Sequence, residues 1–97
     1  MKADIEELKK KVAPIARDYG VKSVYLFGSF ARGDADENSD YDVYIEKGKI
    51  VGFFKLMSFE NALKAALQRS VDIVTSGNDN EKLQYAIRRD RVLLYEA

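Results

Sequence analysis

Two short groups of residues have the types and the spacing for chemistry on a phosphate. Gly28-Ser29 follows an apolar run, and after ten further residues Asp40 and Asp42 stand at positions i and i+2. A glycine and a serine at the end of a strand can wrap a phosphate with backbone N–H groups and a hydroxyl. Two aspartates at i and i+2 point to the same side of a strand, with Cα atoms roughly 6.5–7 Å apart. Together the two groups could hold a metal–triphosphate, which favours phosphoryl chemistry over simple binding.

A third carboxylate, Asp72, lies in another predicted strand. Nucleotidyl transfer needs charge stabilisation on the attacked and leaving oxygens, which two divalent ions about 3.5–4 Å apart supply well. Carboxylates bridge such ions, so Asp40, Asp42 and Asp72 are predicted metal ligands and catalytic residues. Asp72 could also accept the proton of the incoming hydroxyl. Arg32, one helical turn after Ser29, either reaches a phosphate oxygen or is an ordinary exposed helix arginine.

Composition narrows the kind of metal and partner. The 97 residues contain neither cysteine nor histidine, so an oxygen-bound ion, magnesium or manganese before zinc, is expected. The 16 basic and 16 acidic residues cancel, which gives no reason to expect tight, nonspecific binding to nucleic acid. No apolar run approaches the roughly 18–20 residues that cross a bilayer, and the N-terminus has no signal-peptide core. We therefore expect no membrane partner and a cytoplasmic protein.

Periodicity predicts the elements that must position these residues. The order is helix, strand, short helix, strand, helix, strand, helix, which predicts one α/β (α+β) domain over residues 1–97, with a small mixed sheet covered by helices. Asn78 and Glu81 resemble a capping box for the last helix. The predicted ranges are helix 2–19, strand 21–27, helix 29–32, strand 41–45, helix 53–69, strand 71–75 and helix 79–90, with 92–95 either a strand or an extended tail.

Each of these signals also has a purely structural interpretation. Gly28-Ser29 alone is more often a capped turn, and a pair of aspartates alone is more often a solvated strand face. Asp34 and Asp36 form a second Asp-x-Asp, but they lie in a polar loop and are expected to be solvated. Phe53, Phe54 and Phe59 are at helical spacing and are interpreted as core or interface. Aspartate is disfavoured in strands, however, so three at matched positions favour a site over the structural interpretations.

The motifs resemble a known superfamily. Phe27 to Gly33, followed by Ser39 to Val43, resembles the signature Gly-Ser, ten residues, Asp-x-Asp of the nucleotidyltransferases related to DNA polymerase β. The segment Val71-Asp72-Ile-Val resembles the third-acid strand of that superfamily, and the length is similar to that of the prokaryotic minimal nucleotidyltransferases, or MNT proteins. The resemblance covers about residues 5–95. Tyr41 and Tyr44 depart from it, since such strands often carry aliphatic residues there.

The resemblance implies a role for each matched position. Gly28 and Ser29 would bind the nucleoside triphosphate, Asp40 and Asp42 would bind magnesium, and Asp72 would be the third catalytic carboxylate. MNT proteins commonly act as antitoxins beside a helical HEPN-type toxin, and the implied chemistry is transfer of AMP from ATP to a tyrosine of that toxin. The alternatives are an antitoxin that neutralises its partner by binding alone, and transfer to a small molecule such as an aminoglycoside. A homo- or hetero-oligomer is compatible with the sequence.

Overall fold

Four strands and four helices alternate along the part of the chain that the computed structural model describes, residues 3–77 and 80–97. The predicted α/β fold class and the predicted order of elements are confirmed, and residues 92–96 form a strand rather than a tail. The elements are α1 (Ile5–Tyr19), β1 (Ser23–Phe27), α2 (Gly28–Arg32), β2 (Tyr41–Glu46), α3 (Phe53–Leu67), β3 (Val71–Thr75), α4 (Glu81–Asp90) and β4 (Val92–Glu96).

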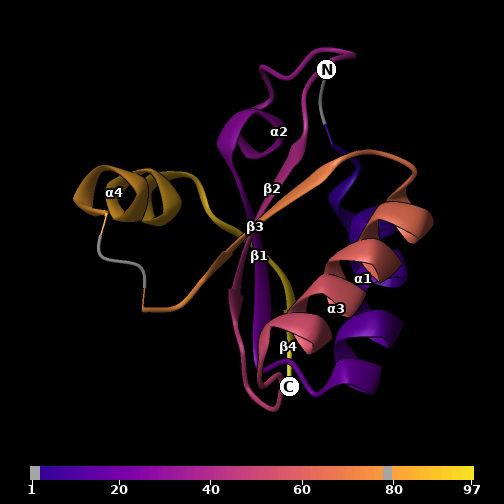
Figure 1. Cartoon of the computed structure of the whole chain (residues 1–97). Coiled ribbons are helices and arrows are strands. Elements are labelled where there is room, and N and C mark those ends of the chain that lie inside the picture. Colours follow the sequence, from indigo (N-terminus) through magenta and orange to yellow (C-terminus); the bar gives the residue numbers. More distant parts are fainter. Residues whose placement is uncertain (1–2, 78–79) are drawn as a thin grey trace.

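The strands form one mixed sheet in the order β3-β2-β1-β4. β1 is antiparallel to both of its neighbours, β2 and β4, whereas β2 and β3 are parallel. A parallel pair needs a crossover connection, and α3 supplies it (Figure 1). The crossover brings a strand from later in the chain against β2, and β3 is thereby an edge strand of the sheet.

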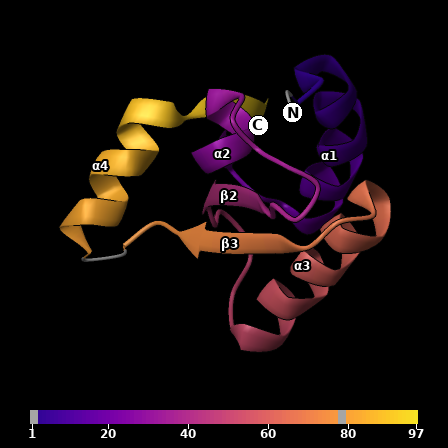
Figure 2. The ribbon, with the colours of Figure 1, turned by 90° about the horizontal axis from the view of Figure 1, so that it is seen from above.

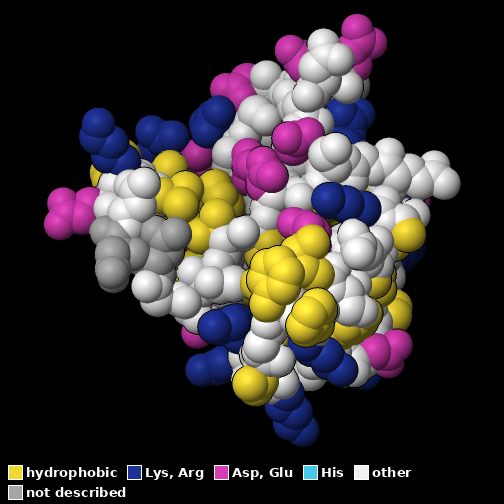
Figure 3. All heavy atoms as spheres, viewed as in Figure 1, with side chains coloured by type: hydrophobic (Ala, Val, Ile, Leu, Met, Phe, Trp, Pro, Cys, Tyr) yellow, Lys and Arg dark blue, Asp and Glu magenta, His cyan; other side chains and the backbone are white. Residues whose placement is uncertain are grey.

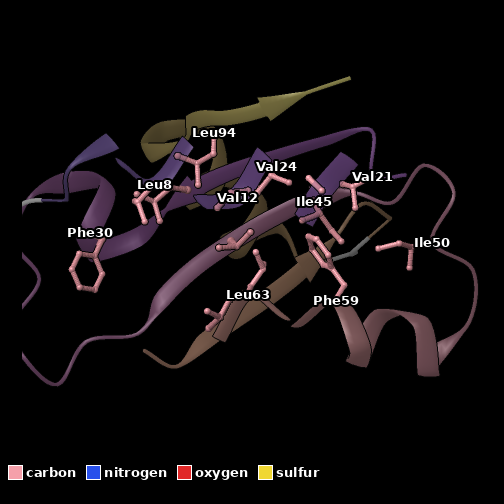
Figure 4. Close-up of a cluster of buried hydrophobic side chains, with 14 of the residues drawn as sticks. Leu8, Val12, Val21, Val24, Phe30, Ile45, Ile50, Phe59, Leu63 and Leu94 are labelled. Carbon is pink, nitrogen blue, oxygen red and sulfur yellow. The ribbon is translucent and has the colours of Figure 1, made fainter. Parts of the chain in front are cut away.

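The two faces of the sheet differ in what covers them. α1 and α3 lie against one face, and α2 and α4 lie toward the other, as the two perpendicular views agree (Figures 1 and 2). Val24 and Leu26 of β1 and Val43 and Ile45 of β2 are buried beneath α1 and α3. Alternation along each strand sends the residues between them to the other face. The hydrophobic core therefore occupies one side of the sheet (Figure 4), and the acidic positions are on the opposite side.

The helix ends follow local capping rules. Asp4 caps α1 by accepting from the backbone N–H of Glu7 at 3.1 Å, and Gly20, with φ 71°, ends the helix as predicted. The helix α4 begins at Glu81, and the predicted start at about 79 lies outside the described residues. Its cap is Asn80, which has an extended backbone and accepts from the N–H of Leu83 at 3.1 Å. The predicted cap residue at position 78 lies outside the described residues.

The helix α3 carries apolar side chains on its exposed surface as well as on its buried side. Phe59 and Leu63 are fully buried against the core, whereas Phe53 and Phe54 are 69% and 87% exposed. Of the two interpretations of these aromatic residues, core or interface, the first is confirmed for Phe59, whereas the second stays a prediction for Phe53 and Phe54. Apolar side chains gather on the surface over α3 (Figure 3). The helix ends at Leu67, two residues before the predicted end, because the next residue adopts a left-handed backbone conformation. None of the described helices is long and apolar enough to span a membrane.

Candidate active site

The turn from β1 into α2 requires glycine. Gly28 is buried and has φ 75°, a left-handed conformation that residues with a side chain rarely adopt. A Cβ added at this position would overlap the carboxylate of Asp42. Ser29 follows in the first turn of α2, where backbone N–H groups have no carbonyl partner within the helix. The turn thus presents amide donors and a hydroxyl beside a carboxylate.

Strand register brings two of the predicted acids together. Asp42 pairs with Phe27, the last residue of β1, and on its other side with Asp72 of β3. Directly paired residues on neighbouring strands share a face, so the carboxylates of Asp42 and Asp72 both lie on the face opposite the main core. Asp40 precedes β2 and is exposed, as is Asp72, while Asp42 is half-buried. The three acids and the Gly28 turn therefore meet at one end of the sheet, where acidic side chains gather in Figure 3.

The negative charge at this end is only partly balanced. Burial raises the pKa of Asp42 above its ordinary value, and the charges of Asp72 and then Asp40 raise it further. The guanidinium of Arg32 acts in the opposite direction. A carboxylate in this position is costly to ionise without a counter-charge, so the site favours a cation beside Asp42.

The donor set fits a hard divalent cation. All three acids supply carboxylate oxygens, and the chain has no histidine or cysteine to offer a softer ligand. Burial first, and then the negative charges of Asp72 and Asp40, raise the pKa of Asp42, and a divalent cation would offset this cost of ionising the carboxyl. Among residues 3–77 and 80–97, the acidic side chains as they lie in this structure do not form a group of three close enough together to hold an ion. The residues fit a metal in type and location, and their carboxylates would have to move closer together to bind it.

Arg32 is held by two acids that lie near the end of α2 and the end of α4. Its Nη1 donates to Oδ2 of Asp90 at 2.8 Å, and its Nε donates to Oδ2 of Asp34 at 3.2 Å. The side chain of Asp90 is 3% exposed, whereas that of Asp34 is 62% exposed. Arg89 also binds Asp90, at 2.8 Å. Arg32 therefore lies close enough to Asp42 to affect its pKa, but its guanidinium is anchored on the carboxylate of Asp90.

Sequence reasoning missed two residues of this region. Asp90 anchors Arg32, and Arg69 donates from Nη1 to the backbone oxygens of Glu37 and Ser39, just before Asp40. A weak signal for Arg69 exists, because the loop from 34 to 40 is acidic and contains no basic residue of its own. No local signal marks Asp90, since its role depends on where α4 packs.

The sheet face beside the acids is open. The half-buried rings of Tyr25 and Tyr44 lie 6.1 Å apart between their centres, and Arg91 lies over Tyr25 at 5.1 Å. Both tyrosines share this face with Asp42, since Tyr25 pairs with Tyr44 and Asp42 is two residues before Tyr44. No enclosed pocket forms within the described part of the chain. A molecule that reacts at these acids would approach across an exposed surface.

A mixed sheet with a Gly-Ser turn facing paired aspartates defines the nucleotidyltransferase class of folds. Residues 10–97 match the protein family described as "Polymerase beta, Nucleotidyltransferase". The chain therefore belongs to the polymerase β nucleotidyltransferase family, and the resemblance found in its motifs is confirmed.

Two relatives indicate the branch of the family. A Methanocaldococcus jannaschii protein named "Putative protein adenylyltransferase MJ0435" is 33% identical over 90 residues, which cover 93% of this chain and 91% of that protein. Protein adenylyltransferase MntA of Thermococcus cleftensis is 31% identical over 74 residues, which cover 76% of this chain and 75% of MntA. Both similarities extend over at least three quarters of each chain.

Solved structures share the fold. A structure described as a "putative minimal nucleotidyltransferase" superposes with a TM-score of 0.76 at 28% identity, covering 93% of this chain and 95% of that one. The complex of a tri-AMPylated Shewanella oneidensis HEPN toxin with its MNT antitoxin contains a chain that superposes with a TM-score of 0.72 at 19% identity, covering 96% and 73%. The predicted minimal nucleotidyltransferase fold is confirmed.

Proposed function

We propose that this protein is an adenylyltransferase that moves AMP from ATP to a tyrosine hydroxyl of a HEPN-type toxin, and that it acts in the cytoplasm as the antitoxin. Its relatives are named protein adenylyltransferases, and a solved complex that shares its fold pairs an MNT antitoxin with an AMPylated HEPN toxin. The observation that carries the proposal is the pairing of Asp42 with Asp72 directly beside the Gly28 turn.

Each part of the site has a role in this reaction. The amides at Gly28 and Ser29, with the serine hydroxyl, bind phosphate oxygens of ATP. Asp40, Asp42 and Asp72 hold Mg²⁺, or Mn²⁺ in its place. The bound ion would supply charge stabilisation at the α-phosphate and the leaving pyrophosphate. Arg32 would add positive charge on the α2 side of the phosphates.

Asp72 is suited to receive the proton of the acceptor. The hydroxyl oxygen bonds to the α-phosphorus, the bond from that phosphorus to the pyrophosphate oxygen breaks, and the hydroxyl proton passes to the carboxylate. Asp72 is exposed and belongs to the edge strand β3, so a hydroxyl on another protein can approach it from outside the sheet. Asp42 is half-buried between two strands and is less accessible to an acceptor.

The open surface favours a protein acceptor over a small molecule. A small acceptor needs walls that hold it, and small-molecule sites are usually concave clefts. The described residues form no enclosed pocket, and the acids lie on an exposed sheet face. A partner protein can supply the missing walls when it docks. The relatives named protein adenylyltransferases further favour transfer to a toxin over transfer to an aminoglycoside.

Labelling with two forms of ATP tests the proposal. The protein is incubated with Mg²⁺ and a HEPN-type toxin from the same organism, using ATP labelled at the α- or the γ-phosphate. Label from the α-position alone is expected on a toxin tyrosine, because AMP is transferred and pyrophosphate leaves. Label from the γ-position would indicate a kinase, and no label from either would contradict the proposal.

Two variants separate catalysis from damage to the fold. Asp42→Asn should abolish labelling, whereas Asp18→Asn, which changes an exposed acid on α1, the helix that lies against the opposite face of the sheet, should leave it unchanged. A triple variant with alanine at positions 40, 42 and 72 then tests whether the protein neutralises the toxin by binding it without transfer. If this variant still protects cells from the toxin, binding alone accounts for the antitoxin effect.

A further inference from the structure

Arg69 lies where three parts of the candidate site meet. It follows α3 and comes three residues before Asp72, and Gln68, with φ 53°, turns the chain just ahead of it. The side chain extends to the loop that leads into Asp40. It also reaches an aromatic residue of α2, the short helix that starts at the Gly28 turn. One side chain thus contacts segments that are far apart in the sequence.

The contacts of Arg69 fix both position and orientation. Its Nη1 donates to the backbone oxygen of Ser39 at 2.8 Å and to that of Glu37 at 3.0 Å. Its guanidinium carbon lies 5.0 Å from the ring centre of Phe30 and 5.9 Å from that of Tyr41. The two rings are themselves 4.4 Å apart. Hydrogen bonds to carbonyls and contact with aromatic rings together restrain the planar group.

The loop that Arg69 contacts is bonded to α2 at its start, where the backbone N–H of Asp34 donates to the backbone oxygen of Ser29 at 3.0 Å, and is held further on by bonds within itself. Oδ1 of Asp36 accepts from the backbone N–H of Asn38 at 2.9 Å, and the N–H of Ser39 donates to the backbone oxygen of Asp36 at 3.1 Å. These two bonds shape a local turn, and after Asp40 the backbone N–H of Tyr41 donates to the backbone oxygen of Ser70 at 3.0 Å, which joins the end of the loop to the start of β3. The bonds from Arg69 join that turn to the segment just before β3, and the same guanidinium lies over the ring of Phe30 in α2. They end one residue before Asp40.

Arg69 differs from Arg32 in how it acts. Arg32 alters the pKa of Asp42 through its charge, whereas Arg69 is not among the groups that shift that pKa. The Nη1 of Arg69 donates to two backbone carbonyls of the loop before Asp40. Its contribution is therefore geometric.

We infer that Arg69 is a positioning residue: it sets the loop before Asp40 against α2, so that Asp40 and Asp42 face the Gly28 turn in the arrangement that binds the metal and ATP. This inference rests on the proposed function for the chemistry, but its geometric content can be measured without any acceptor. Lysine cannot replace arginine here, because it lacks the planar group that serves two carbonyls and lies over the rings.

The test compares Arg69→Lys and Arg69→Ala with Tyr19→Phe. The control removes the hydrogen bond between the Tyr19 hydroxyl and Ser58, at 2.6 Å, which joins α1 to α3 away from the acids. All variants are studied at a temperature where circular dichroism shows them folded. Binding of Mn²⁺ alone is followed by electron paramagnetic resonance, and hydrogen exchange is followed at the amides from 37 to 42.

We expect both Arg69 variants to bind Mn²⁺ about 10–100-fold more weakly, the usual loss when an outer-shell partner of a metal ligand is removed, and to exchange faster at 37 to 42. The control should change neither. Mn²⁺ affinity and exchange equal to those of the control would overturn the assignment. If wild type labels no acceptor while the Arg69 variants still lose Mn²⁺ affinity and loop protection, the proposed function fails and the assignment of Arg69 stands.

Discussion

The carboxylate of Asp42 fills the space that a side chain at Gly28 would need. This relationship ties the turn that begins α2 to the acid at the centre of the candidate site. The two residues belong to adjacent strand ends, since Phe27 pairs with Asp42. A change at either residue therefore affects both the phosphate turn and the acids.

Gly28→Ala should remove transfer activity and destabilise the fold. The new side chain pays about 1–2 kcal/mol for the left-handed backbone and must also displace Asp42. Gly33→Ala is a matched control at the other end of α2. Its φ of 87° is equally unfavourable, but a Cβ there meets no atom within 4 Å. Urea unfolding should give a larger loss for Gly28→Ala, and equal losses would contradict the overlap.

Asp42→Asn should make the metal-free protein more stable at neutral pH while removing activity. The pKa of Asp42 is raised by burial and by Asp72 and Asp40, so the folded state binds this proton more readily than the unfolded state. The stabilisation from protonated Asp42 is fully present below the pKa of the unfolded carboxyl and is lost as pH rises through the raised, folded-state pKa.

The pH dependence of unfolding checks this prediction. The stability of Asp42→Asn relative to wild type should increase between about pH 3 and pH 7. Transfer should fall by more than the roughly 100-fold that loss of an outer-shell partner can cost. Mg²⁺ should stabilise wild type more than the variant. A variant that is less stable than wild type without metal at neutral pH would count against the electrostatic account.

Asp90→Asn should destabilise the protein by about 1–3 kcal/mol, because the buried carboxylate accepts charged hydrogen bonds from Arg89 and Arg32. The hydrogen bond from Arg89 has the larger effect, and together with the bond from Arg32 it holds the pKa of Asp90 below its ordinary value. Its stabilisation is present above the pKa of the unfolded carboxyl and is lost as pH falls through the lowered, folded-state pKa.

Asp34→Asn provides the comparison for Asp90. Asp34 binds the same arginine, but its side chain is 62% exposed, so its loss should cost no more than about 1 kcal/mol. Chemical denaturation of both variants at neutral pH measures the difference. An Asp34 variant as unstable as the Asp90 variant would show that burial does not govern the strength of these pairs.

Gln68→Gly should stabilise the protein by about 1 kcal/mol. Gln68 ends α3 with φ 53°, a conformation that costs a residue with a side chain about 1–2 kcal/mol and costs glycine little. Thermal unfolding should shift upward by about 4–8 °C for each kcal/mol in a domain of this size. Gln68→Ala keeps the strain and should give no such gain. A glycine variant that melts below wild type would contradict the prediction.

Much of the fold was predictable because its signals are local. Alternation along β2 put Asp42 on the face opposite Val43, and the apolar stripes of α1 and α3 identified Leu8 and Phe59 as buried residues. The order of the strands was not predictable in the same way. It depends on how β4 returns beside β1, which no pattern within either strand encodes.

In the candidate site, too, residues with a local signal were predictable, and residues that act through distant contacts were not. Residue type and spacing predicted Gly28 and the three acids as site residues, because the chemistry restricts which residues can serve, and the strand register places Asp42 and Asp72 side by side. Arg69 and Asp90 escaped notice, since each acts through contacts with segments distant in the sequence. The exposed Phe53 and Phe54 were interpreted as core or interface from spacing alone, yet helical spacing does not reveal which side of a helix the rest of the chain covers.

The parallel pairing of β2 with β3 also has a consequence for how activity is acquired during folding. The two strands carry Asp42 and Asp72 at paired positions, and all of α3 separates them along the chain. A slip of one residue would turn Asp72 toward the core and bring an apolar neighbour to the face that carries the candidate site. Contacts between distant segments are the slow ones to form. Recovery of activity after dilution from denaturant should therefore follow the slowest pairing event in the sheet and lag behind the recovery of helical signal.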